Sequence, residues 1–192
     1  MAQDILKQTS RVTRIVESLM NFSHAGSSLE KTKLAPANLA DCVDEAIHLL
    51  ALDREAKPVQ FDNQCDRELL VLADSQRLLQ VFINLLGNAR DACDNNGEVH
   101  IRASTGGDQV QIDVEDNGSG IPQALQAQVF EPFFTTKDPG VGTGLGLALV
   151  FSIMDDMNGK VHLTSPVSPD VQCGTRVTLS LSSACYGPGY EM

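Results

Sequence analysis

The chain has 192 residues and a net charge of −11, from 14 basic and 25 acidic residues. This acidic balance disfavours a nucleic-acid-binding protein, which needs a basic face, but it permits a small polyanion held by backbone amides and one lysine. No apolar run approaches the roughly 20 residues of a membrane span, and the N-terminus lacks a signal-peptide pattern.

Residues 1–33 are predicted to form a helical arm and a linker. Apolar side chains recur at helical spacing between Asp4 and Ser23. The stretch that follows, SHAGSSLEKTK, is small and polar, which is typical of a linker. The globular domain is expected to cover residues 34–192.

The globular part is predicted to contain three helices and six strands. Asn38 is a suitable N-cap for a helix to about Leu52, and Asp74 is one for a second helix over residues 75–94. A TGGD turn between two alternating stretches indicates a hairpin. The third helix is expected over residues 145–158, and the strands over residues 58–63, 68–73, 98–104, 109–114, 160–165 and 175–182. Helices segregated from a mostly antiparallel sheet predict an α+β protein, a two-layer α/β sandwich with an N-terminal helical arm.

Four stretches carry functional residue types. The second helix contains NLLGNARDA, which places Asn84 and Asn88 on one face. A predicted strand leads into DNGSGI, and FEPFFTTK (130–137) and GVGTGLGLAL (140–149) follow.

In this order, the stretches resemble the N, G1, F and G2 boxes of the ATP-binding domain of sensor histidine kinases. That family shares the Bergerat fold of the GHKL superfamily with gyrase, mismatch-repair and heat-shock-chaperone ATPases. The resemblance covers residues 34 to about 182 and is closest to the nitrogen-regulation subgroup. It implies ATP and Mg²⁺ as cofactors. It also implies ATP contacts from Asn84, Asn88, Asp91, Asp116, Gly118, Gly120, Ile121, Phe134, Thr135, Thr136, Lys137, Gly142, Thr143, Gly144, Leu145, Gly146, Leu147 and Thr175.

The chemistry of the DNGSGI stretch is consistent with this resemblance. Alone, Asp-Asn-Gly is typical of a surface turn. A carboxylate at a strand end, Asp116, can also accept a hydrogen bond from the exocyclic amine of adenine, while Gly118 and Gly120 let the backbone approach the ring. Guanine carries an acceptor at that position. We therefore expect Asp116 to recognise adenine.

Phosphate and metal binding are expected at two helices. Asn88 presents a neutral amide oxygen, which suits Mg²⁺ bound to ATP phosphates. The GVGTGLGL sequence leads directly into a helix, whose first amides can hold phosphates. Lys137 can contribute a cation there; a solvated lysine is the alternative. The resemblance places Thr175 near the adenine.

One position distinguishes two reaction classes. Gyrase-like hydrolases carry a glutamate, the general base for water, one turn before the metal-binding asparagine. Here that residue is Asn84, and an amide cannot take up a proton at neutral pH, so transfer of the γ-phosphoryl group to another nucleophile is favoured. Asn84, Asn88 and Lys137 are the expected catalytic residues. Some kinase subgroups carry a lysine at Asp91, which Arg90 could partly replace.

The phosphoacceptor of a histidine kinase is not recognisable in this chain. Such a histidine lies on a dimeric helical hairpin and is followed by an acidic residue and later by a proline. None of the four histidines has this context: His24, His48, His100 and His162. We interpret the chain as a fragment that cannot phosphorylate itself. Its expected partners are the histidine-bearing dimerisation helices of a homodimeric parent kinase and a response regulator receiver domain.

Two alternatives stay open. A Bergerat-fold ATPase could use ATP for conformational switching, and a non-catalytic module could only bind nucleotide. The five cysteines are odd in number and lack a CxxC pair, so neither a zinc site nor a disulfide framework is indicated. This pattern favours a reducing, cytoplasmic location, which is compatible with a membrane-anchored parent protein.

Overall fold

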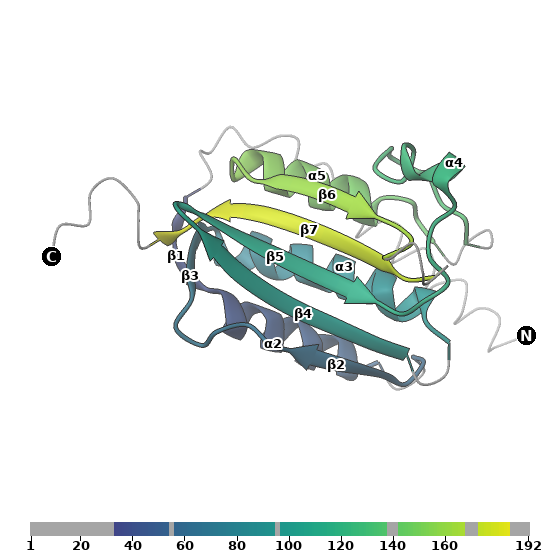
Figure 1. Cartoon of the computed structure of the whole chain (residues 1–192), viewed down its shortest axis with the longest axis horizontal. Helices are drawn as coiled ribbons and strands as arrows, with labels where there is room; N and C mark the ends of the chain where they lie inside the picture. The colour runs from purple at the N-terminus through teal and green to yellow at the C-terminus, as the bar shows by residue number, and fades with distance from the viewer. Residues whose placement is uncertain (1–32, 54–55, 95–96, 138–141, 168–172, 185–192) are drawn as a thin grey trace, which may run out of the picture.

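The computed structural model describes residues 33–53, 56–94, 97–137, 142–167 and 173–184, which form two layers. One layer is a five-stranded sheet, in the order β2 (Val59–Asn63), β4 (Gly97–Gly106), β5 (Gln109–Asp116), β7 (Thr175–Ser182) and β6 (Lys160–Thr164). One face of the sheet is covered by three helices (Figure 1), which are α2 (Leu39–Ala51), α3 (Ser75–Ala92) and α5 (Gly146–Asp156). The predicted α+β two-layer sandwich is confirmed, whereas the predicted arm helix lies outside the described residues.

The alternation of buried and exposed side chains along β5 and β7 places two polar residues at the end of the hydrophobic core. The sheet is antiparallel apart from the parallel pair of β2 and β4. Along β5 every second side chain faces the helices, so Val110, Ile112 and Val114 are buried, and the same side continues to Asp116. In β7 the residue paired with Asp116 is Thr175, which is also buried. The apolar stripe of the sheet therefore ends in a carboxylate and a hydroxyl.

The hydrophobic core lies between this face of the sheet and the helices, with α3 packed between α2 and α5. Leu78, Phe82 and Leu86 recur every four residues on α3, and all three are fully buried. They belong to one cluster with Ile101 of β4 and Leu179 of β7. This packing fixes α3 relative to the end of the sheet.

Both predicted helix caps are confirmed. Asp74 is the N-cap of α3, and its Oδ1 accepts hydrogen bonds from the amides of Gln76 and Arg77, each at 3.1 Å. Asn38 begins α2, and its Oδ1 accepts from the Asp41 amide at 3.0 Å. In each case a side-chain oxygen satisfies first-turn amides that have no partner within the helix.

Asp74→Ala is expected to lower the free energy of unfolding by about 1 kcal/mol, because two first-turn amides of α3 lose their acceptor. Urea denaturation measures the change. Asp74→Ser restores a capping oxygen and should recover most of the loss. An equal loss in both variants would argue against a capping role.

Two short elements were not predicted. The strand β1 (Ala35–Asn38) pairs with β3 (Leu70–Ala73) in a separate two-stranded sheet. It is four residues long and contains Pro36, so only its partner strand defines it. The helix α4 (Gln123–Gln126) is also only four residues long, which is too short for a periodic signal.

Candidate functional site

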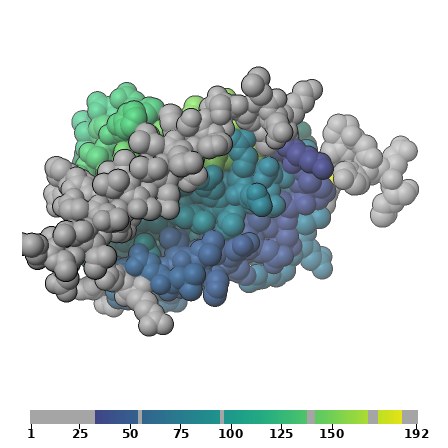
Figure 2. Space-filling model, turned by 180° about the vertical axis from the view of Figure 1, so that it is seen from behind, coloured from purple at the N-terminus to yellow at the C-terminus, as the bar shows by residue number. Residues whose placement is uncertain are grey.

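A cavity of about 310 Å³ lies beside the turn that follows β5. Its size is within the range of small-molecule sites. Its walls come from the C-terminal half of α3, the turn after β5, the segment around α4 and the start of α5. In the view from behind, the green segment with α4 forms the edge of the molecule away from α2 (Figure 2). The lining residues are Asn88, Asp91, Ala92, Ser119, Gly120, Ile121, Pro122, Leu125, Val129, Phe134, Thr135, Thr136, Lys137, Gly142, Thr143, Gly144, Gly146 and Leu147.

Most of the predicted site residues line this cavity. The exceptions are Asn84, Asp116, Gly118, Leu145 and Thr175. Several wall residues were not predicted, among them Leu125 and Val129. Their spacing of four residues, directly after the DNGSGI stretch, is the signal that could have indicated them.

Asp116 holds its carboxylate in a buried position, with 8% of the residue exposed. Its Oδ1 accepts hydrogen bonds from the backbone amides of Gly118 at 2.9 Å and Thr175 at 3.2 Å. Among the described residues, nothing donates to Oδ2. Oδ2 is not fully shielded from solvent. Among the described residues, the one fully buried side-chain polar atom that lacks a hydrogen-bond partner is Nε of Arg90, not Oδ2 of Asp116. One oxygen is therefore fixed by the protein and the other is free for a ligand.

Burial has an electrostatic consequence for this carboxyl group. Desolvation is the largest influence on Asp116 and raises its pKa, while the hydrogen bonds from Gly118 and Thr175 oppose the shift. The site thus keeps an acceptor in a place where water competes weakly for its hydrogen bonds.

Packing requires a glycine at position 118, and backbone conformation favours one at position 120. A Cβ on Gly118 would lie 2.6 Å from the Ala92 carbonyl oxygen, so the last turn of α3 occupies that space. The Ser119 amide donates to the same carbonyl at 3.1 Å, and α3 ends here, two residues before its predicted end. Gly120 has a φ of +73°, which favours glycine, and it lines the cavity. Gly118 therefore makes room for α3, a role that the sequence did not indicate.

Asn84 and Asn88 lie on the flank of α3 that faces the start of α5. A Cβ on Gly146 would lie 3.1 Å from Asn84 Oδ1 and 3.6 Å from Asn88 Nδ2. Asn84 Nδ2 donates to the Gln80 carbonyl of the preceding turn at 2.8 Å. Among the described residues, the Asn88 side chain makes no hydrogen bond, and it lines the cavity. Its amide oxygen is therefore available as a ligand.

The N-terminus of α5 adds backbone donors to the same wall. Its N-cap is Leu145, which provides no side-chain acceptor, so the first amides are uncapped. Gly144 has a φ of +66°, and its carbonyl accepts from the Phe133 amide at 2.9 Å. This bond fixes the backbone that leads into α5. The N-terminus of α5 is the positive end of the helix dipole, which favours a bound anion.

Lys137 and Asp91 form an ion pair at the rim of the cavity. Lys137 Nζ lies 2.5 Å from Asp91 Oδ2, and the two side chains are 33% and 45% exposed. Exposed ion pairs of this kind contribute little, so Lys137 can transfer to a more negative ligand at small cost. Arg90 does not line the cavity: it donates to the Leu50 carbonyl at 3.2 Å. The idea that Arg90 replaces a lysine at the site is therefore not supported.

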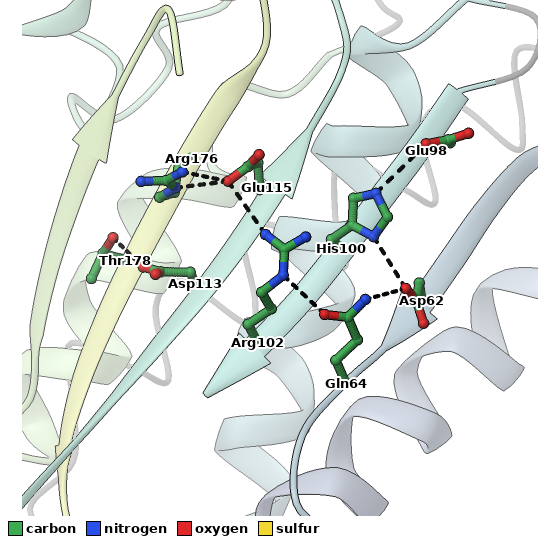
Figure 3. Close-up of polar contacts among 9 residues, drawn as sticks. All are labelled: Asp62, Gln64, Glu98, His100, Arg102, Asp113, Glu115, Arg176 and Thr178. Atoms are coloured by element: carbon green, nitrogen blue, oxygen red, sulfur yellow. Dashed lines mark hydrogen bonds and ion pairs between the residues drawn. The ribbon is translucent and has the colours of Figure 1, made fainter. Parts of the chain in front are cut away.

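None of the described histidines lines the cavity. His48 on α2 and His162 on β6 are exposed. His100 lies on the outer face of the sheet, where Nδ1 is 3.2 Å from Asp62 and Nε2 is 3.6 Å from Glu98 (Figure 3). The fourth histidine lies outside the described residues.

Residues 73–184 match the family model described as histidine kinase-, DNA gyrase B-, and HSP90-like ATPase. This range is more than half of the chain, and it contains α3, the turn after Asp116 and α5. The chain therefore belongs to this family. Within the family, it is a catalytic domain of the sensor histidine kinase type, as its relatives indicate.

Two curated relatives share about a third of their aligned residues with the chain. The alginate biosynthesis sensor protein KinB of Pseudomonas aeruginosa is 34% identical over 164 residues, which cover 85% of this chain and 28% of KinB. The signal transduction histidine-protein kinase AtoS of Escherichia coli strain K12 is 34% identical over 163 residues, or 84% of this chain and 26% of AtoS. The chain thus spans about a quarter of the length of these relatives.

Solved structures agree with this assignment. Full-length ShkA in complex with AMPPNP superposes with a TM-score of 0.75 at 25% identity, covering 90% of this chain and 36% of ShkA. The histidine kinase ThkA, in complex with the response regulator protein TrrA, gives a TM-score of 0.70 at 28% identity. That match covers 93% of this chain and 49% of ThkA.

Proposed function

We propose that this domain binds ATP and transfers its γ-phosphoryl group to a histidine of the parent kinase, for relay to a response regulator aspartate. The observation that carries the proposal is the buried Asp116 carboxylate, with Oδ1 bonded to two amides and Oδ2 free. The exocyclic amine of adenine matches the free oxygen, whereas the carbonyl of guanine does not. The AMPPNP complex of ShkA supports an adenine nucleotide as the ligand.

The phosphate end of the nucleotide is assigned to the two helices. The residues present fit Mg²⁺. The side-chain amide of Asn88 makes no hydrogen bond among the described residues, and it lies beside the uncapped start of α5. When bound, Mg²⁺ neutralises part of the phosphate charge. Asn88 and the first amides of α5 orient the phosphates, and Lys137 leaves Asp91 to contact them.

Phosphoryl transfer is favoured over hydrolysis by the residue one turn before Asn88. Asn84 cannot act as a general base, and its Nδ2 is bonded to the Gln80 carbonyl. No described histidine lines the cavity, so we assign the nucleophile to the histidine-bearing dimerisation helices of a homodimeric parent. The complex of ThkA with TrrA supports a response regulator receiver domain as the next partner.

We place the domain in the cytoplasm, whether or not its parent is anchored in a membrane. In the described ranges, no helix combines the length and the apolar character that a membrane crossing requires. Residues 1–33 are assigned to the helical arm and linker, and residues 34–192 to the ATP-binding domain.

Incubation with γ-labelled ATP tests the proposal. Alone, the chain should take up no acid-labile phosphate, because an imidazole in line with the γ-phosphoryl group is required. A supplied hairpin with an intact acceptor histidine should become labelled. Release of free phosphate without labelling would favour the conformational ATPase, and nucleotide binding without either reaction would favour a binding module. Label on the chain itself, lost in His24→Gln, would contradict the assignment of the acceptor.

A further inference from the structure

Two turns enclose the buried carboxylate at the end of β5, and one serine joins them. The first turn, residues 117–121, follows β5, and the second, residues 173–174, directly precedes β7. They contact each other directly, since the Gly174 amide donates to the Gly118 carbonyl at 2.8 Å. Ser165, directly after β6 and only 9% exposed, connects both turns through its hydroxyl.

The Ser165 hydroxyl uses its full hydrogen-bonding capacity in this place. Its Oγ accepts from the Ile121 amide at 2.7 Å and donates to the Gly174 carbonyl at 2.8 Å. The Thr175 hydroxyl donates to the same oxygen at 3.4 Å. A serine hydroxyl has one donor and two acceptor positions, so all of them are engaged within the protein. This serine is therefore suited to orient the two turns rather than to contact a ligand.

Gln126 holds the same turn from the side of α4. Its Nε2 donates to the Ile121 carbonyl at 2.9 Å and to the Ser165 carbonyl at 2.5 Å. Ile121 is thus held on its amide by the serine and on its carbonyl by the glutamine. A Cβ on Gly120 would lie 3.0 Å from Ser165 Oγ, so the cavity wall passes directly against this hydroxyl.

We propose that Ser165 is a positioning residue for the nucleotide base, assisted by Gln126. It acts through the turn 117–121, in which residues 119–121 line the cavity, and through Thr175, whose amide donates to Oδ1 of Asp116. A base that bonds to the free oxygen must also fit against the turn, so its affinity depends on the spacing between them. This inference rests on the proposed adenine binding and adds a residue that touches neither base nor phosphate.

Ser165→Ala tests the inference. The Ile121 amide and the Gly174 carbonyl lose their partner, and the Kd values for ADP and for adenosine should both rise about tenfold. The factor should be the same for both ligands, because adenosine has the base without phosphates. In the labelled transfer to a supplied hairpin, the KM for ATP should rise similarly while kcat stays near its original value. A role in stability alone would lower the Tm and leave both Kd values unchanged.

Two further variants make the test specific. Ser183→Ala is the matched control, because Ser183 is a buried serine, 3% exposed, beyond the opposite end of β7. It should lower the Tm without changing either Kd. Gln126→Ala, in the partly exposed α4, should raise both Kd values about threefold, and it takes the place of Ser165→Ala if that variant does not fold.

The outcomes separate this inference from the proposed function. Unchanged Kd values in Ser165→Ala, or in Gln126→Ala as its replacement, would overturn the positioning role. If Asp116→Asn then loses ADP binding, the positioning role alone has failed. If Asp116→Asn also binds ADP normally, adenine recognition by that carboxylate has failed as well.

Discussion

Asp116→Asn is expected to lower the affinity of the domain for ADP by about 100-fold. The Gly118 and Thr175 amides donate to Oδ1, so in the variant the amide oxygen must occupy this position. The NH₂ group is then forced into the place of Oδ2, where a donor faces the exocyclic amine of adenine. The loss of one hydrogen bond and the unpaired donors together cost about 3 kcal/mol, which corresponds to the 100-fold change. Isothermal titration calorimetry measures it.

GDP is the matched control ligand for this variant. The wild-type domain should prefer ADP, because its free carboxylate oxygen would face the guanine carbonyl. In Asp116→Asn the NH₂ group can donate to that carbonyl, so most of the preference should disappear. ADP affinity like that of the wild type, or an unchanged preference over GDP, would remove Asp116 from the site.

The same substitution should not unfold the domain. Burial raises the pKa of Asp116, so the folded state disfavours the ionised form. This penalty is absent below the pKa of the unfolded state and grows as the pH rises through the window up to the raised, folded-state pKa. At pH 7 the penalty is therefore present in the wild type and absent in Asp116→Asn. The variant should be at least as resistant to urea, and a marked loss of stability would show that the carboxylate has another partner.

Asn88→Ala is expected to remove the dependence of ADP affinity on Mg²⁺ and to slow phosphoryl transfer by about 100-fold. The Asn88 side chain lines the cavity beside the first turn of α5, and its amide makes no hydrogen bond among the described residues. Its loss removes a ligand at the phosphate end and leaves the base site intact. Adenosine affinity should therefore stay unchanged.

Titrations of ADP with and without Mg²⁺ measure the first effect. The two Kd values should differ in the wild type and converge in Asn88→Ala. Labelling of a supplied hairpin by γ-labelled ATP measures the second. If Asn88→Ala keeps the full response to Mg²⁺, the metal ligand is another residue, and a parallel loss of adenosine binding would indicate a general disruption of α3.

The sequence by itself determined the features that depend on neighbouring residues. Alternation along residues 109–114 predicted the strand β5, and side-chain oxygens at Asn38 and Asp74 predicted where two helices begin. These signals are local, because a strand repeats every two residues and a cap acts within one turn. The order of the four functional stretches likewise indicated the family and most of the residues that line the cavity.

Only the tertiary structure decided how distant residues meet around the site. Ile121 and Ser165 are 44 residues apart, and Asp91 and Lys137 are 46 residues apart. Position 118 likewise requires a glycine because the C-terminal end of α3, from a different part of the chain, leaves no room for a Cβ. No periodic pattern links such pairs, since their contacts arise only when strand pairing and helix packing bring separate segments together. The residue types of the site were therefore readable along the chain, while its hydrogen-bonded framework required the folded molecule.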